Sequence, residues 1–345
     1  MTLHIMHVNL AKGFRGGERQ TELLIRALAE QKVRQTLVCR TNSPLRDRLS
    51  CTPDLQFIDA NHQLQGHLKA PKADLIHAHE AKAVHWAWLH HCLYKTPYIL
   101  TRRVPQTIKN TRFNQYCYEH AQYAVAISSP IETHLHSKQW CPVARIPSAL
   151  AHLKNNPDQV KALKEQYAHN FVVGHIGALV DKHKGQREII KAAKLLENEI
   201  PEAIFLILGD GPDKEALLAE SQGLSNIKWL GFKSDIGDYL AIMDLFVFPS
   251  RNEGLGSTLL DVMDYQIPII ASNVDGIPDI VIHEKTGILI PPNDAQALAS
   301  AIAELNKKPA TRQQLAEQAT AGLLKYTPEA MAQRYLQLYR NILQR

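Results

Sequence analysis

Two acidic residues flank a glycine-rich turn in the second half of the chain. Glu253 and Asp261 stand eight positions apart in SRNEGLGSTLLDVMD (250–264), which follows an apolar run typical of a buried strand. Glycines let a ligand approach the backbone closely, and a helix N-terminus suits a diphosphate. The residues that could bind it are Gly254, Leu255, Gly256, Ser257 and Thr258. Two carboxylates would repel a phosphate, so we expect Glu253 and Asp261 to contact hydroxyl groups, such as those of a hexose and a ribose. The alternative is a capped strand–helix junction with solvated acids.

The first half holds a second set of candidates. Gly16 and Gly17 open an expected helix, although such a pair is common in tight turns. His77 and His79 close the expected strand of DLIHAHEAKA (74–83), and ligands of parallel α/β sheets bind outside the carboxyl ends of strands. A His-x-His pair could also ligate a metal. The sequence shows no third and fourth ligand at suitable spacing, so we expect no metal site.

Two arginines follow another expected strand. Arg102 and Arg103 come directly after PYILT (97–101) and could bind an anionic group. The alternative is that both are exposed loop arginines.

The elements that must position these residues are short apolar runs alternating with helical patterns. Expected strands cover 3–10, 35–39, 74–79, 97–101, 123–128, 171–177, 204–209, 227–231, 245–250, 268–272 and 287–290, and expected helices cover 18–30, 185–199, 213–223 and 328–343. This alternation predicts two parallel, doubly wound α/β halves. The polar, proline-containing stretch 146–157 is the expected linker. We therefore expect domains at 1–150 and 151–327, with a terminal helix at 328–345.

The composition is that of a globular protein with an uneven distribution of charge. The 345 residues are 45% hydrophobic and 21% charged, close to the average of globular proteins. The N-terminus reads as a strand rather than a signal peptide. The five cysteines show no C-x-x-C spacing, which favours reduced thiols in the cytoplasm. Residues 1–150 carry 19 basic and 10 acidic side chains, a net charge of +9, whereas the remainder has a net charge of −4. The first half is therefore expected to face something anionic, unless the charge simply partitions unevenly.

The segment 250–264 resembles the E-x₇-E signature of glycosyltransferase family 4, with Asp261 in place of the second glutamate. The resemblance implies that Glu253 holds hydroxyls of the donor sugar, that Asp261 holds the ribose, and that the amides from Gly254 to Thr258 bind the diphosphate. Aspartate is one methylene shorter than glutamate, so Asp261 reaches less far toward the ribose than the family's glutamate.

The resemblance extends over nearly the whole chain. GALVDKHKGQ (177–186) is similar to the family's G-R-L-x-x-x-K-G segment, so Lys184 is expected to neutralise the diphosphate, while Ala178 stands at the usual arginine position. The resemblance further implies base contacts near Gly211, Phe232 and Lys233, donor contact at Gly17, acceptor contact at Gly16, Arg102 and Arg103, and His79 beside the reacting sugar.

The fold implied by the family is GT-B: two Rossmann-like domains facing each other across a cleft, with the last helix returning to the first domain. The implied activity is retaining transfer of a hexose-type sugar from a UDP- or GDP-sugar to a glycan or glycolipid, without cofactor or metal. Lipopolysaccharide or surface polysaccharide synthesis fits the basic first half, which predicts a cytoplasmic protein, peripheral on the anionic inner face of the membrane, that binds no nucleic acid.

Two other functions remain open at this point. One is a nucleotide-sugar 2-epimerase of the same fold, which needs no acceptor. The other is a non-catalytic nucleotide- or polyanion-binding protein. A nicotinamide enzyme is disfavoured because no G-x-G-x-x-G follows the first strand.

Overall fold

The computed structural model describes residues 3–344 and divides into two compact units. The first runs to Ala149 and resumes at Lys325, and the second is Leu150–Leu324. Each unit has one parallel β-sheet with helices in the connections, so the expected α/β class is confirmed.

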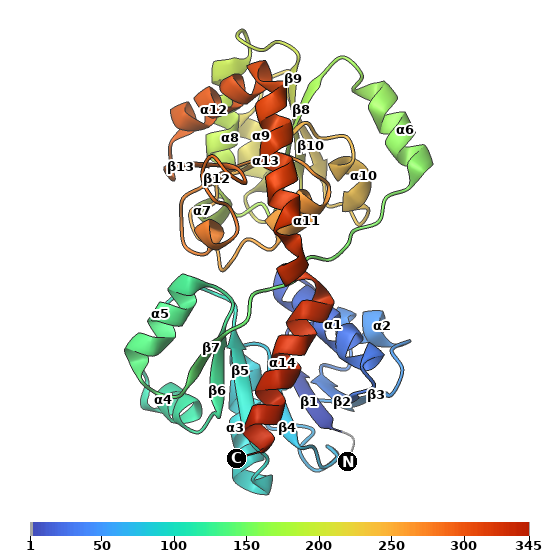
Figure 1. Ribbon diagram of the computed structural model, residues 1–345, viewed down its shortest axis with the longest axis vertical. Helices are drawn as coiled ribbons and strands as arrows, with labels where there is room; N and C mark the ends of the chain where they lie inside the picture. The colour runs from blue at the N-terminus through green and yellow to red at the C-terminus, as the bar shows by residue number, and fades with distance from the viewer. Residues whose placement is uncertain (1–2, 345) are drawn as a thin grey trace. The chain divides into compact units, whose positions relative to one another are not determined.

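The first unit has a seven-stranded sheet in the order β3-β2-β1-β4-β5-β6-β7 (Figure 1). Its strands are β1 (His4–Asn9), β2 (Arg34–Cys39), β3 (Leu55–Asp59), β4 (Leu75–Ala78), β5 (Tyr98–Arg102), β6 (Tyr123–Ala126) and β7 (Val143–Arg145). Its helices are α1 (Gly16–Glu30), α2 (Pro44–Leu49), α3 (Ala81–Tyr94), α4 (Arg112–Glu119), α5 (Ser129–Lys138) and α14 (Pro328–Leu343).

The second unit has a six-stranded sheet in the order β10-β9-β8-β11-β12-β13. Its strands are β8 (Phe171–Ile176), β9 (Ala203–Leu208), β10 (Ile227–Gly231), β11 (Leu245–Phe248), β12 (Ile269–Ser272) and β13 (Ile288–Ile290). Its helices are α6 (Pro157–Gln166), α7 (Asp181–Lys184), α8 (Gln186–Leu196), α9 (Lys214–Glu220), α10 (Ile236–Leu240), α11 (Thr258–Asp264), α12 (Ala295–Lys307) and α13 (Pro309–Ala321). Short 3₁₀ turns cover η1 (Ile277–Asp279) and η2 (Leu323–Tyr326).

Both sheets reverse their strand order beside the first strand. β1 pairs with β2 and β4, and β8 pairs with β9 and β11. Such switch points leave a crevice at the carboxyl ends of the strands, where α/β proteins bind ligands. The loops after β4, β8 and β11 carry His79, Lys184 and Glu253, so the topology brings the sequence candidates to these ends.

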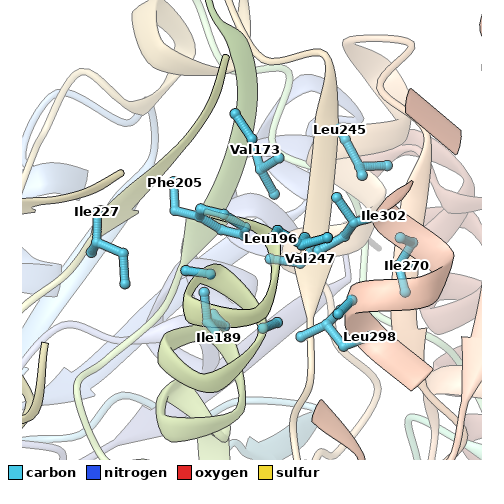
Figure 2. Packing of buried hydrophobic residues seen from close by; sticks show 14 of the residues in the cluster. Val173, Ile189, Leu196, Phe205, Ile227, Leu245, Val247, Ile270, Leu298 and Ile302 are labelled. Atoms are coloured by element: carbon cyan, nitrogen blue, oxygen red, sulfur yellow. The ribbon is translucent and has the colours of Figure 1, made fainter. Parts of the chain in front are cut away.

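Apolar side chains from sheet and helices form the core of the second unit. Figure 2 shows Phe205 and Val247 of the sheet packed with Ile189 of α8 and Leu298 of α12. The strands are nearly all buried on both faces, as parallel strands covered by helices should be.

Helix α14 belongs to the core of the first unit, although it is the last helix in the chain. Its residues Met331, Tyr335 and Ile342 join the same cluster as Leu24 of α1 and Leu75 of β4. Where α14 packs on the sheet, the Tyr339 hydroxyl lies 2.7 Å from Nδ1 of His77 in β4. α14 therefore covers the sheet beside α1 (Figure 1).

Two strands, β3 and β7, were not expected from the sequence. Both are edge strands. β3 contains only half-buried and exposed residues, and β7 has only three residues. An edge strand lacks the continuous apolar run by which buried parallel strands are recognised.

The bond between Tyr339 and His77 yields a stability prediction. Tyr339→Phe would leave a buried ring nitrogen without its partner, which should lower the free energy of unfolding by about 1–3 kcal/mol. Denaturant unfolding measures this loss, with exposed Gln337→Ala on the same helix as control. A loss of less than ~0.5 kcal/mol for Tyr339→Phe, the range of ordinary surface substitutions, would show that the hydroxyl does not hold α14 in place.

Candidate functional site

A lysine and a glutamate from two different loops meet beside the switch point of the second sheet. Lys184 ends α7 after β8, and Glu253 lies in the loop after β11. The Lys184 Nζ atom donates to Glu253 Oε2, and the side chains are 22% and 17% exposed. The same ammonium group lies 5.1 Å from the centre of the Phe248 ring. The site thus joins a cation, a carboxylate and an aromatic face at the surface of the unit.

Gly185 explains why α7 can deliver Lys184 to this place. Its φ of +68° is in the left-handed region, and a Cβ there would lie 2.1 Å from the carbonyl oxygen of Pro249. Any larger residue would push α7 away from the β11 loop, since this obstacle is backbone. The Lys-Gly pair therefore couples the two loops.

Arg251 reinforces the same junction and was not anticipated from the sequence. Its guanidinium group pairs with Asp181 at 3.0 Å and with Glu188 at 2.9 Å, and its backbone N–H donates to the His183 carbonyl. The two carboxylates are 7% and 5% exposed. Hydrogen bonds from Arg187 and Arg251 hold the pKa of Asp181 below its ordinary value despite burial. A signal was present, because Arg251 lies two residues before Glu253 and Asp181 three before Lys184.

The glycine-rich turn runs from the buried Gly254, Leu255 and Gly256 into Ser257 and α11, which begins at Thr258. Gly256 has a φ of +80°, a conformation that favours glycine. The Glu253 N–H donates to Asp275 Oδ2 at 2.8 Å, which fixes the start of the turn. The turn is therefore held at its start by a hydrogen bond and shaped in its middle by a glycine.

Asp261 has a partner inside its own unit. It is 8% exposed, and its Oδ1 atom accepts a hydrogen bond from the Ala151 N–H at 2.6 Å. The linker is also held by Tyr265, whose hydroxyl donates to the Leu153 carbonyl. Asp261 thus binds the backbone of the linker, a contact that the sequence did not predict.

The remaining donor candidates line neighbouring loops. A Cβ on Gly211 would lie 2.4 Å from the Leu179 carbonyl oxygen, so this glycine permits the loops after β8 and β9 to approach each other. Phe232 is 76% exposed, and Lys233 lies 5.6 Å from the Tyr239 ring centre. Ala178 is exposed and contributes its carbonyl to Gln186.

A buried histidine, also unanticipated, supports the β8 loop. His175 is fully buried, with Nδ1 3.0 Å from the Val247 carbonyl oxygen, which requires that nitrogen to be the donor. Burial lowers the pKa of His175 to about 4. The ring is therefore neutral at physiological pH, and Lys184 meets no second positive charge there.

In the first unit, the two arginines after β5 differ. Arg102 donates to the Gln106 carbonyl and is bonded to the phenol of Tyr118. Arg103 instead extends over the start of α1, where its Cδ would be 3.5 Å from a Cβ on Gly17. Gly16 and Gly17 are the first two residues of that helix. The structure thus brings Arg103, and not Arg102, to the glycine pair.

Three histidines come together under the switch point of the first sheet. His7 of β1 lies opposite His77 of β4 in the register, and His79 follows β4. Their ligand atoms lie within 4.8 Å of one another, a grouping that could hold a metal ion. The expectation that no third ligand accompanies the His-x-His pair was therefore wrong. His7 is 70 residues away in sequence from His77, and only the parallel pairing of β1 with β4 brings them together.

The hydrogen bonds assign the protons of this cluster. Gln35 donates to the Ile25 carbonyl, so its oxygen accepts from His7 Nε2 at 3.0 Å. His7 Nδ1 must then accept from His79 Nε2 at 3.0 Å. His79, 2% exposed, is left with a deprotonated Nδ1 that has no hydrogen-bond partner.

Burial and the neighbouring Arg103 keep these rings neutral. Burial is the largest cause for all three; it lowers the pKa of His7 to about 3 and holds the pKa values of His77 and His79 well below the ordinary value. Arg103 lowers the pKa values of His77 and His79 further. The site that the sequence placed at a strand end is thus a neutral imidazole cluster, with His79 beneath the surface.

Two protein-family models match the chain, one in each of the two structural units. Residues 14–149 match the family model described as Glycosyltransferase Family 4, and residues 157–322 match the model described as Glycosyl transferases group 1. The two matches fall on either side of the linker. They confirm the resemblance inferred from the sequence.

Curated relatives and solved structures agree with this assignment. The chain is 27% identical to the lipopolysaccharide core biosynthesis glycosyltransferase LpsD of Rhizobium meliloti, over 64% of each chain. It is 26% identical, over 87% of each chain, to the UDP-Gal:alpha-D-GlcNAc-diphosphoundecaprenol alpha-1,3-galactosyltransferase of Escherichia coli. The matches to the first few curated relatives span less than two thirds of those relatives' own length.

The fold is shared with a solved structure. Anabaena HepE in complex with UDP and glucose superposes with a TM-score of 0.84 at 19% identity, covering 98% of this chain and 100% of that one. The GT-B fold is thereby confirmed. Among residues 3–344, the helices are too short or too polar to cross a bilayer.

The buried histidines predict a marked acid sensitivity. A histidine whose pKa is lowered on folding stabilises the protein above its ordinary pKa of 6.5, and this stability is lost as the pH falls toward the folded value. His7 and His175 should each cost about 1.4 kcal/mol of unfolding free energy per pH unit below that point. Denaturant unfolding at pH 7.5, 6.5 and 5.5 tests this. His175→Asn, which keeps a donor near Val247 but cannot titrate, should flatten the profile; a profile equally steep in this variant would contradict the assignment.

Proposed function

We propose that this chain, a GT-B-fold glycosyltransferase whose two halves resemble family 4, moves a hexose-type sugar from a UDP-sugar to a glycan or glycolipid acceptor with retention of configuration. The observation that carries the proposal is the pairing of Lys184 with Glu253 beside the glycine-rich turn. HepE, which shares the fold, binds UDP and glucose, and this favours uridine as the base. The named relatives favour synthesis of lipopolysaccharide or another surface glycan.

The second unit would bind the diphosphate, the sugar and the nucleoside of the donor through different residues. The amides from Gly254 to Thr258 and the Lys184 ammonium group would hold the diphosphate, because both offer positive charge or N–H donors. Glu253 would accept hydroxyls of the sugar. Asp261 would accept a ribose hydroxyl, and Gly211, Phe232 and Lys233 would border the base.

Lys184 would contribute most when the glycosidic bond breaks. The leaving diphosphate gains negative charge in the transition state, and a cation already fixed beside it stabilises that state more than the ground state. Ala178 supplies no second cation at the position where the family has arginine. Gly185 and the Arg251 pairs hold Lys184 in advance, so little reorganisation is needed during the reaction.

The acceptor would bind to the first unit through Gly16 and Arg103 beside the start of α1, with Arg102 at the end of β5, and Gly17 would contact the donor. His79 would accept a hydrogen bond from the reacting sugar at Nδ1, which has no hydrogen-bond partner in this structure. That atom is buried in this structure, so this role requires access that the present conformation does not provide.

The charge distribution favours docking to an anionic membrane, peripheral on the inner face. The basic side chains of 1–150 are accompanied by exposed Phe113 and Tyr116 on α4, which suit the interface between headgroups and acyl chains. Binding to vesicles containing phosphatidylglycerol should fall as salt rises, since exposed charges are screened over about 8 Å at physiological ionic strength. Cosedimentation measures this, with phosphatidylcholine vesicles as control. Equal binding to both vesicle types, or none to either, would remove the membrane from the proposal.

Lys184→Ala tests the catalytic role most directly. With saturating donor and acceptor, we expect the rate to fall by roughly 10²–10³, the scale seen when one fixed electrostatic donor is lost. The matched control is Lys182→Ala, which removes an exposed lysine from the same short helix. Ala178→Arg in the Lys184→Ala chain should restore part of the rate. A near-wild-type rate for Lys184→Ala would show that the diphosphate is neutralised elsewhere.

A further inference from the structure

Lys184 and Glu253 are each other's partner in this structure, whereas the proposed function gives each of them a different one. Lys184 Nζ donates to Glu253 Oε2, and the two side chains are 22% and 17% exposed. In the proposed function the ammonium group would bind the diphosphate, and the carboxylate would accept hydroxyls of the sugar. A donor that binds here therefore has to replace the partner of both groups.

The surrounding backbone lets the ammonium group change partners while the loops stay in place. Lys184 is the last residue of α7, and Gly185 after it packs its backbone on the carbonyl of Pro249. The lysine stem passes Gly177, where a Cβ would lie 3.8 Å from the Cδ atom of Lys184. The stem is a flexible four-carbon chain, so only its last bonds have to turn for Nζ to leave Glu253.

Arg251, the arginine at the same junction, is not free to bind a diphosphate in place of Lys184. Its Nη1 atom pairs with Asp181 at 3.0 Å, and its Nη2 atom pairs with Glu188 at 2.9 Å. Its Nε atom donates to the side-chain oxygen of Asn293. All three nitrogen atoms of this guanidinium group are engaged, so the carboxylate of the ion pair and a diphosphate compete for the Lys184 ammonium group.

Two carboxylates lie beside the glycine-rich turn. The Glu253 Cγ atom would lie 3.5 Å from a Cβ on Gly256, so this side chain folds back over the turn. Asp275 accepts the Glu253 N–H at 2.8 Å and adds a second negative charge. A diphosphate at the turn therefore meets like charge at close range, where repulsion is strongest. A sugar hydroxyl that donates to Glu253 offsets this repulsion.

We propose that Glu253 makes the site discriminate between an intact nucleotide sugar and the UDP that transfer leaves behind. Hydroxyls of a bound sugar occupy Glu253 and release Lys184 to the diphosphate. After transfer, UDP keeps the electron pair of the broken bond, and the proton of the acceptor hydroxyl passes to solvent. The terminal phosphate of UDP then carries about one more negative charge near pH 7. Glu253 has lost the sugar, pairs with Lys184 again and promotes the release of UDP.

This inference rests on the proposed function for the nature of the ligand. The exchange of partners at Lys184 rests on the ion pair alone. Inorganic pyrophosphate, which has neither base nor sugar, therefore tests the exchange separately from the activity.

The test is calorimetric titration of pyrophosphate, UDP, UDP-glucose, UDP-galactose and UDP-N-acetylglucosamine without added metal. Glu253→Gln keeps the shape of the side chain and removes its charge, so Lys184 is no longer held. Pyrophosphate and UDP should bind this variant at least fivefold more tightly than the parent chain. The Kd of the UDP-sugar that binds best should fall less than twofold or rise, because the acceptor of its hydroxyls is weakened. The control is Glu284→Gln, which removes an equal charge from a side chain that is 79% exposed and should change each Kd less than twofold.

A double-mutant cycle separates exchange of partners from simple repulsion. In chains that carry Lys184→Ala, Glu253→Gln should tighten pyrophosphate binding by a smaller factor, because no ammonium group is released there. Weak binding is followed by ³¹P NMR line width. An equal factor in both backgrounds would show that Lys184 binds the anion without leaving Glu253, and would overturn the proposal.

Glu253→Ala is the second variant, and thermal melting checks that each variant is folded. It removes the carboxylate altogether and should tighten pyrophosphate binding at least as much as Glu253→Gln. Unchanged or weaker binding of pyrophosphate to both variants, or equal changes for UDP and the UDP-sugar, overturns the proposal. If the binding results hold for a UDP-sugar that the protein does not cleave, the proposed activity fails while the discrimination by Glu253 stands.

Discussion

The ion pair between Lys184 and Glu253 is the interaction on which the second unit's site depends. Neither residue lies on a strand: Lys184 ends the short helix α7, and Glu253 lies in the loop after β11. The close approach of Gly185 to Pro249 and the pairs from Arg251 to Asp181 and Glu188 hold these two segments together. A half-buried pair of this kind adds little to stability by itself, since desolvation offsets much of the Coulomb attraction. In the proposed function its value would be that a cation and a carboxylate are already in place when a diphosphate sugar arrives.

The first unit contains a buried group of basic side chains. Four groups that could carry positive charge, His7, His77, His79 and Arg103, lie close together beneath the switch point of its sheet. Burial removes the charge from the three imidazoles, and hydrogen bonds from Gln35 through His7 to His79 fix the protons of those two rings. Only Arg103 remains charged, so its unpaired N–H groups stand out as the positive feature of this region. A metal ion would have to break the hydrogen bonds of His7 and His77 and approach a guanidinium group, so the cluster is better suited to remaining neutral and metal-free.

The sequence predicts groups of residues that lie close together along the chain. It does not predict groups that only strand pairing brings together. Glu253, Lys184 and the turn between Gly254 and Thr258 are read from motifs within a few residues, and the alternation of apolar runs predicts both parallel sheets. The third histidine could not be found, because His7 meets His77 only through the register of β1 and β4. Arg102 and Arg103 look alike in sequence, and only the direction of their side chains separates them. Asp261 shows the same limit: its bond to Ala151 depends on where the linker runs.

The central claim is that the second unit cleaves the bond between sugar and UDP with retention. The most direct measurement uses water as the acceptor. UDP-glucose, UDP-galactose and UDP-N-acetylglucosamine are incubated with the protein, and ¹H NMR records the anomer of the sugar released before it mutarotates. At least one donor should yield UDP together with the α-anomer, at a rate that Lys184→Ala lowers by roughly 10²–10³. Release of the β-anomer, or conversion of the donor to a 2-epimer without release of UDP, would contradict it.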